Sequence, residues 1–179
     1  YKKKKLYDSS MTYYLKSLES VKGQVNPPLV YYNIGETLFL KKLVDSSFHF
    51  YKEAERYAIE SHHPRGLAYA YFGLAEVNFR KGNINQAIEL QKRSLNIRNQ
   101  IDDVRGAIQS YLKLASYLMA SGDVSEVNTQ IETAKKLTDQ VEANDLFLEA
   151  RYLEYQYLSE IGEYKLANDV LKKYESLKD

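Results

Sequence analysis

Apolar residues recur along the chain at intervals of three and four, the spacing that places side chains on one face of an α-helix. Two such runs are separated by the polar turn Lys81-Gly82-Asn83. The apolar positions on either side of this turn are Tyr71, Leu74, Ala75, Ile84, Ala87 and Ile88. No stretch keeps the alternation of a β-strand, although the 17 tyrosines favour strands by propensity. The pattern predicts an all-α chain.

A phrase of seven residues is written twice, because positions 4–10 read KKLYDSS and positions 41–47 read KKLVDSS. Glycines then recur at a step of 40 residues, at Gly82, Gly122 and Gly162. Repetition at such a period indicates one supersecondary unit that is copied and stacked. KKLYDSS would then be the turn of a first unit that lacks its first helix. We expect equivalent turns between helices at Lys42, Gly82, Gly122 and Gly162.

Each unit is expected to be a pair of antiparallel helices, with small residues where the two helices cross closely. Small residues recur at the same step in two columns, with Val127 as an exception in the first and Tyr174 as an exception in the second: Ser47, Ala87 and Ala167, then Ala54, Ser94 and Ala134. Prolines fall where one unit gives way to the next, at Pro27, Pro28 and Pro64. The expectation is a single solenoid over residues 1–179 with about nine helices. Its units are approximately 1–24 (partial), 25–64, 65–104, 105–144 and 145–179.

The spacing Tyr71-x2-Leu74-Ala75-x6-Gly82-x-Ile84-x2-Ala87-x6-Ser94 resembles the tetratricopeptide repeat (TPR). The 40-residue step is similar to that of the longer repeats of kinesin light chain, G-protein-regulating scaffold proteins and bacterial peptide-sensing regulators. This resemblance covers nearly the whole chain and implies a right-handed α-α superhelix. The last unit departs from the pattern, since Arg151 and Glu154 stand where Tyr and Leu are expected.

The final phrase, from Gly162 to Leu177-Lys178-Asp179, resembles the last repeat of TPR sensor regions in bacterial histidine kinases and transcription regulators. That resemblance implies a coiled coil, a membrane span and an output domain after Asp179. It also implies that this fragment is monomeric or weakly dimeric while a longer chain dimerises. The location would be periplasmic if the sensor-kinase resemblance holds, and cytoplasmic otherwise.

Composition excludes several classes of partner. The net charge of +1 gives no field that attracts nucleic acid, and the basic run Lys2–Lys5 is interpreted as a solvated helix end. No apolar run approaches the roughly 18 residues of a membrane span. The chain begins at Tyr1 without Met, as an excised fragment does, so the lack of a signal segment is uninformative.

No motif indicates catalysis, because the chain has no Gly-rich phosphate loop, no HExxH and no nucleophile elbow. His62 and His63 lie beside Pro64 without a third ligand, which favours a capped, solvated turn over a metal site. Asp102 and Asp103 are interpreted as an acidic helix start. We therefore predict neither an enzyme nor a site for a cofactor or metal.

TPR families bind partners on the concave wall made by the first helix of each pair. Carrying that rule over position by position implies a partner-binding set of Leu29, Tyr32, Glu36, Phe39, Tyr69, Phe72, Glu76, Phe79, Arg80, Leu112, Met119 and Tyr152. Chaperone-binding TPR domains hold a C-terminal carboxylate with Lys and Asn side chains on this wall. This clamp is missing here, because equivalent positions of successive units hold Glu36 and Glu76. An amphipathic helix suits the aromatic residues of this set better than an acidic peptide terminus does.

The alternative interpretation, in which these rings only pack between neighbouring units, stays open and has a test. Phe72→Ala with Phe79→Ala should abolish partner capture and leave stability nearly unchanged, whereas Leu74→Ala should cost roughly 2–5 kcal/mol. The leading hypothesis is a protein- or peptide-binding module in the sensory or regulatory region of a bacterial signalling protein. A stand-alone scaffold and an accessory domain of an enzyme are the rival hypotheses.

Overall fold

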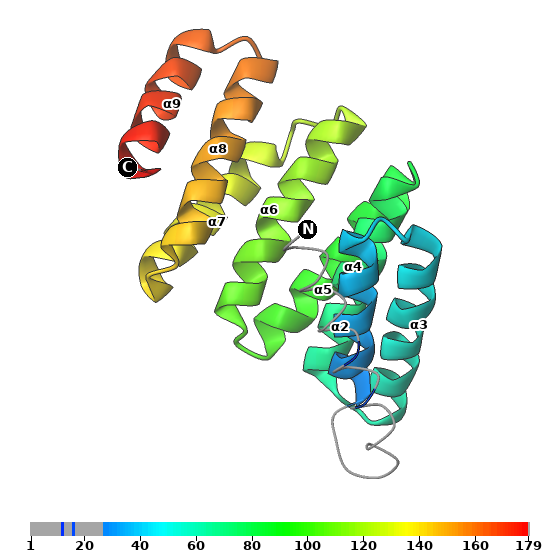
Figure 1. Cartoon of the computed structure of the whole chain (residues 1–179). Helices are drawn as coiled ribbons and strands as arrows, with labels where there is room; N and C mark the ends of the chain where they lie inside the picture. Colours follow the sequence, from blue (N-terminus) through cyan, green and yellow to red (C-terminus); the bar gives the residue numbers. More distant parts are fainter. Residues whose placement is uncertain (1–11, 13–15, 17–26, 179) are drawn as a thin grey trace. The chain divides into compact units, whose positions relative to one another are not determined.

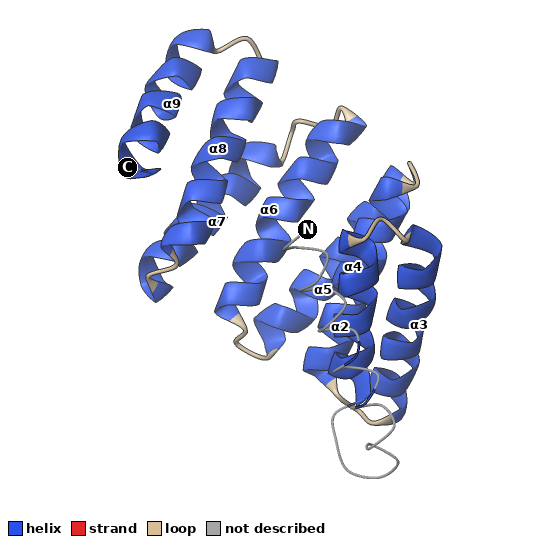
Figure 2. Ribbon diagram, viewed as in Figure 1, coloured by secondary structure: helices blue, strands red, loops and turns tan. Residues whose placement is uncertain are grey.

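The computed structural model describes residues 12, 16 and 27–178, and between 27 and 178 it contains helices and short connections without a strand (Figure 2). Eight helices follow one another in this range (Figure 1): α2 Pro27–Leu40, α3 Val44–Glu60, α4 Pro64–Arg80, α5 Ile84–Gln100, α6 Val104–Ser121, α7 Val127–Val141, α8 Asn144–Glu160 and α9 Tyr164–Lys178. The all-α prediction is confirmed. The orphan helix expected before residue 25 and the KKLYDSS turn lie outside the described residues.

The chain forms two compact units, one up to Ile97 and one from Arg98 onward. In the first unit, α2, α3 and α4 all contact one another. In the second unit, α7 packs against α6 and α8, α8 also contacts α6, and α9 packs on α8. The expectation that the whole chain is a single solenoid stays a prediction.

The turns inside the helix pairs occur at the expected 40-residue step. Each places one residue in the left-handed conformation, with φ of 65° at Lys42, 83° at Gly82, 78° at Gly122 and 83° at Gly162. In every case the amide of the next residue closes the turn by donating to the carbonyl five residues earlier. Glycine is suited to this conformation because it has no Cβ, yet Lys42 adopts it as well. The four predicted turn positions are confirmed.

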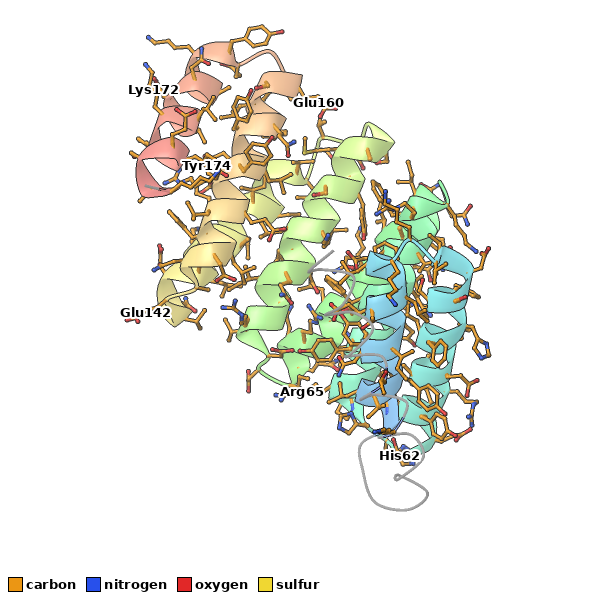
Figure 3. All side chains as sticks on the ribbon, in the orientation of Figure 1. His62, Arg65, Glu142, Glu160, Lys172 and Tyr174 are labelled. Carbon is orange, nitrogen blue, oxygen red and sulfur yellow. The ribbon has the colours of Figure 1, made fainter. Side chains whose placement is uncertain are left out.

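The turns between helix pairs repeat the same conformation at residues that are not glycine. φ is 51° at His62, 54° at Asp102 and 51° at Glu142. Figure 3 labels His62 and Glu142, each at a turn where one helix ends and the next begins. The glycine pattern gave no sign of these turns, although they keep the 40-residue step.

Two of these turns continue into a capped helix. The Nδ1 atom of His63 accepts a hydrogen bond from the amide of Gly66 at 2.8 Å, and Oδ1 of Asp103 accepts one from the amide of Gly106 at 3.2 Å. A Cβ at Gly66 would stand 2.8 Å from His63 Nδ1, and one at Gly106 would stand 2.4 Å from Asp103 Oδ2. The interpretation of the His62-His63 turn as capped and of Asp102 and Asp103 as a helix start is confirmed, and the glycines leave room for the capping side chains.

The core of the first unit is built around Tyr51 of α3, whose exposed fraction is 0%. A Cβ at Gly35 of α2 would stand 2.7 Å from its ring, and one at Gly73 of α4 would stand 2.4 Å away. The ring therefore fits between two helices only because both present a glycine to it. The small residues of both columns are buried, as expected where helices cross closely, and so is Val127, whereas Tyr174 is only half-buried; the buried members are Ser47, Ala54, Ala87, Ser94, Val127, Ala134 and Ala167.

Candidate functional site

Nine of the candidate residues lie on α2 and α4, which contact each other within the first unit. We call this set the α2–α4 surface, and its members are Leu29, Tyr32, Glu36, Phe39, Tyr69, Phe72, Glu76, Phe79 and Arg80. The helices supply them at intervals of three, four and seven residues, so on each helix they follow one face.

Burial divides the aromatic members of the α2–α4 surface. Tyr32 is 6% exposed and Phe72 is 8% exposed, so both rings belong mainly to the packing of the unit. Tyr69, Phe39 and Phe79 are half-buried, as is the aliphatic Leu29. The prediction that Phe72→Ala with Phe79→Ala leaves stability nearly unchanged conflicts with this burial of Phe72, because removing a buried ring opens a cavity.

Ring contacts join the two helices of the α2–α4 surface at two points. The rings of Tyr32 and Tyr69 lie 4.9 Å apart between centroids at an interplanar angle of 47°. Farther along, the guanidinium carbon of Arg80 lies 5.2 Å from the centroid of the Phe39 ring, within the range of a cation–π contact. Each contact connects α2 with α4, so the surface is continuous across the two helices.

A carboxylate, that of Glu36, lies between these two aromatic contacts along α2. Its Oε1 atom accepts a hydrogen bond from the hydroxyl of Tyr32 at 3.2 Å. Burial raises the pKa of Glu36 above its ordinary value of 4.5, and the negative charge of Glu76 raises it further, while the Tyr32 hydrogen bond acts in the opposite direction. The side chain of Glu36 is exposed to solvent, so the desolvation that raises its pKa is partial.

The remaining three candidates lie in the second unit and differ in exposure. Leu112 of α6 is 1% exposed and therefore a core residue, whereas Met119 is half-buried. Tyr152 of α8 is 44% exposed, and its ring lies 5.5 Å from that of Tyr174, which Figure 3 labels on α9. Among the described residues, no ring contact or hydrogen bond joins these three to one another, so the second unit presents single candidates rather than a surface.

An aromatic group on α2 and α3 was missed by the sequence analysis. The rings of Tyr31 and Tyr57 stack at 4.9 Å with an interplanar angle of 14°, and the guanidinium of Arg56 lies 4.0 Å above the Tyr57 ring. Burial, followed by the hydrogen bond to Tyr57, raises the pKa of Tyr31 to about 12. The hydrogen bonds from Tyr31 and Arg56 lower the pKa of Tyr57. The spacing of the charged residues Glu53, Arg56 and Glu60 on one helix face was the feature of the sequence that could have indicated this group.

The second unit contains a hollow of about 80 Å³, lined by Arg98, Asn99, Asp102, Asp103, Val104, Ala107 and Leu137. Ligand pockets are usually about 300–1,000 Å³, so this hollow is too small for a peptide or cofactor. The guanidinium of Arg98 donates to the carbonyl of Gly106 and to Ser110 Oγ, which fixes the α5–α6 turn. The hydrogen bonds of Arg98 therefore stabilise the structure around the hollow.

The part of the chain that the structure describes contains neither a metal-binding cluster nor a membrane-spanning helix. Within it, no three His, Asp or Glu side chains are grouped so as to hold a metal ion. The described helices also lack the combination of length and apolar character that crossing a membrane requires.

Residues 27–100 match the family model described as tetratricopeptide repeat. No curated protein matches the chain significantly. The TPR resemblance is thus confirmed, directly over these residues and through the fold for the helix pairs that follow. The narrower resemblance to sensor regions stays a prediction.

Solved structures with the same fold cover most of the chain. BtubC (BKLC) from P. vanneervenii matches with a TM-score of 0.82 at 14% identity, over 99% of this chain and 75% of that one. A putative kinesin light chain from Podosopora anserina with nearly identical TPR-like repeats gives 0.72 at 12% identity, over 99% and 90%. A Rap protein complexed with Competence and Sporulation Factor gives 0.72 at 19% identity, over 89% of this chain and 46% of that one. At these identities the likeness establishes the TPR-like fold.

Proposed function

We propose that this chain, whose residues 27–100 match the tetratricopeptide-repeat model and whose fold is TPR-like, is a protein- or peptide-binding module that takes its partner on the α2–α4 surface. The observation that carries the proposal is the set of half-buried apolar side chains on two helices in contact, Leu29, Phe39, Tyr69 and Phe79. Aromatic anchors of this kind usually supply most of the binding energy at an interface. No catalytic role is part of the proposal.

A partner in extended or helical form can use this surface because its apolar residues are spaced along two neighbouring helices. Phe39 and Phe79 occupy equivalent positions at the 40-residue step. Tyr69 and Leu29 lie toward the start of the same helices. An amphipathic helix laid along α2 and α4 would bury an apolar stripe against these side chains.

Peptides selected from a random display library against the whole chain test this proposal. We expect the selected peptides to lose more than about tenfold in affinity when Phe39→Ala and Phe79→Ala are combined. Thermal unfolding of the double variant is measured in parallel, to separate lost binding from lost structure.

The matched control is Ile59→Ala, which removes a 53% exposed apolar side chain from α3 of the same unit. This variant should bind the selected peptides as the unaltered chain does. Peptides that bind equally well to the Phe39→Ala, Phe79→Ala variant would contradict the proposed surface.

We further propose that the module serves in bacterial signalling, as the regulatory region of a longer protein. Support comes from the fold that the chain shares with a Rap protein solved in complex with Competence and Sporulation Factor. The rival proposal is a stand-alone scaffold for protein assembly, which is equally compatible with the TPR-like fold. The gene sequence after Asp179 separates the two, because a coiled coil followed by an output domain is expected only for the signalling protein.

A further inference from the structure

Glu36 occupies the middle of the α2–α4 surface, between apolar groups on both sides. Tyr32 lies four residues before it and Phe39 three residues after it on α2. In the part of the chain that the structure describes, the hydrogen-bond partner of Glu36 is the neutral hydroxyl of Tyr32, and no basic side chain forms an ion pair with Glu36. The carboxylate is therefore held in place by a group that does not compensate its charge.

A second carboxylate reinforces the negative character of this position. Glu76 lies at the equivalent place on α4, 40 residues later, and its charge acts unfavourably on Glu36. The raised pKa of Glu36 records this repulsion together with the loss of water around the side chain. A positive group placed beside Glu36 would remove the unfavourable part of this arrangement.

We propose that the α2–α4 surface accepts a partner segment with a Lys or Arg side chain placed against Glu36, flanked by apolar residues that contact Phe39 and Phe79. This inference rests on the function proposed above and names the chemistry of the partner. Carboxylates attract basic groups by hydrogen bonds that are stronger when both partners are charged. The neighbouring ring faces add attraction for the same cation, as the contact of Arg80 with Phe39 already illustrates. An acidic segment would meet repulsion at the same place.

The display selection described above also tests this inference, followed by anisotropy measurements on synthetic copies of the selected peptides. We expect the selected peptides to share a basic residue. Their affinity should be about tenfold lower for the Glu36→Gln variant than for the unaltered chain. Replacing the basic residue of the peptide by Gln should weaken binding to the unaltered chain by a similar factor. The two changes together should cost little more than either alone, because they remove the same contact.

Glu60→Gln is the matched control, since Glu60 is an exposed carboxylate on α3 of the same unit. It forms an ion pair with Arg56. The Glu60→Gln variant should leave peptide affinity unchanged. Selected peptides without a basic residue that still depend on Phe39 and Phe79 and ignore Glu36→Gln would overturn this inference and leave the proposed function intact. Selected peptides that are indifferent to Phe39→Ala and Phe79→Ala would overturn both.

Discussion

Gly73→Ala is predicted to destabilise the first unit, although alanine is the better helix former. The added Cβ would stand 2.4–2.6 Å from three atoms of the Tyr51 ring, against 3.4–4 Å for ordinary contact, a misfit of about 1 Å. Tyr51 is 0% exposed and has no solvent to move into. Overpacking against a rigid ring belongs near the upper end of the usual 1–3 kcal/mol, and alanine recovers about 1 kcal/mol in helix propensity. The net loss should be about 2 kcal/mol.

The assay is urea unfolding of the single and double variants with Tyr51→Leu. Once the ring is removed, Gly73→Ala should become stabilising by about 1 kcal/mol, because only the gain in helix propensity remains. The expected coupling between the two positions is therefore about 3 kcal/mol. Equal effects of Gly73→Ala with and without the Tyr51 ring would refute the reasoning.

Gly82→Ala supplies the contrast, since nothing lies within 4 Å of its Cβ position but its φ is 83°. Its cost, roughly 1–2 kcal/mol, comes from the left-handed backbone, so it should be the same in both backgrounds. A rescue of Gly82→Ala by Tyr51→Leu would show that the coupling at Gly73 is not a local packing effect.

Two further predictions concern the α2–α4 surface. Phe72→Ala should cost about 3–5 kcal/mol in guanidinium unfolding, comparable to Leu74→Ala, because both side chains are buried, and an unchanged midpoint would contradict this. Glu36→Gln should be more stable than the unaltered chain near pH 7 and equally stable near pH 4. The reason is that a carboxyl group whose pKa is raised by folding destabilises the folded state at any pH above that raised pKa. This destabilisation is lost as the pH falls below the ordinary pKa of 4.5. A stability difference that does not change with pH would contradict it.

The helix pairs could be predicted because the turns carry a periodic signal in the sequence. Gly82, Gly122 and Gly162 mark their turns by residue type, and counting backwards found Lys42, which has the same conformation without glycine. The left-handed residues between pairs were missed because Asp102 and its equivalents have no glycine to show them. The role of Gly35 and Gly73 also escaped prediction, since it depends on a ring from a different helix.

The candidate surface could be predicted by position but not by exposure. A helix of this repeat packs on more than one side, so apolar residues at Phe72 and Phe79 follow the same spacing although only Phe72 is buried. Periodicity places a residue on a face but does not say how much of that face a neighbouring helix covers. The equivalent positions of Glu36 and Glu76 could be predicted from the sequence, but the partial loss of water that raises the pKa of Glu36 could not.

The closure of each described turn by hydrogen bonds that span five residues or fewer bears on how the chain folds. Within each unit, the contacts are made by helices that are close in sequence, so contact order is low. Such topologies fold quickly, in the microsecond-to-millisecond range, because little loop-closure entropy is lost before contacts form. In arrays of this kind nucleation can begin at any helix pair and propagate to its neighbours, while terminal pairs open first. We therefore expect hydrogen-exchange protection to fall from the interior helices of a unit toward its terminal helix.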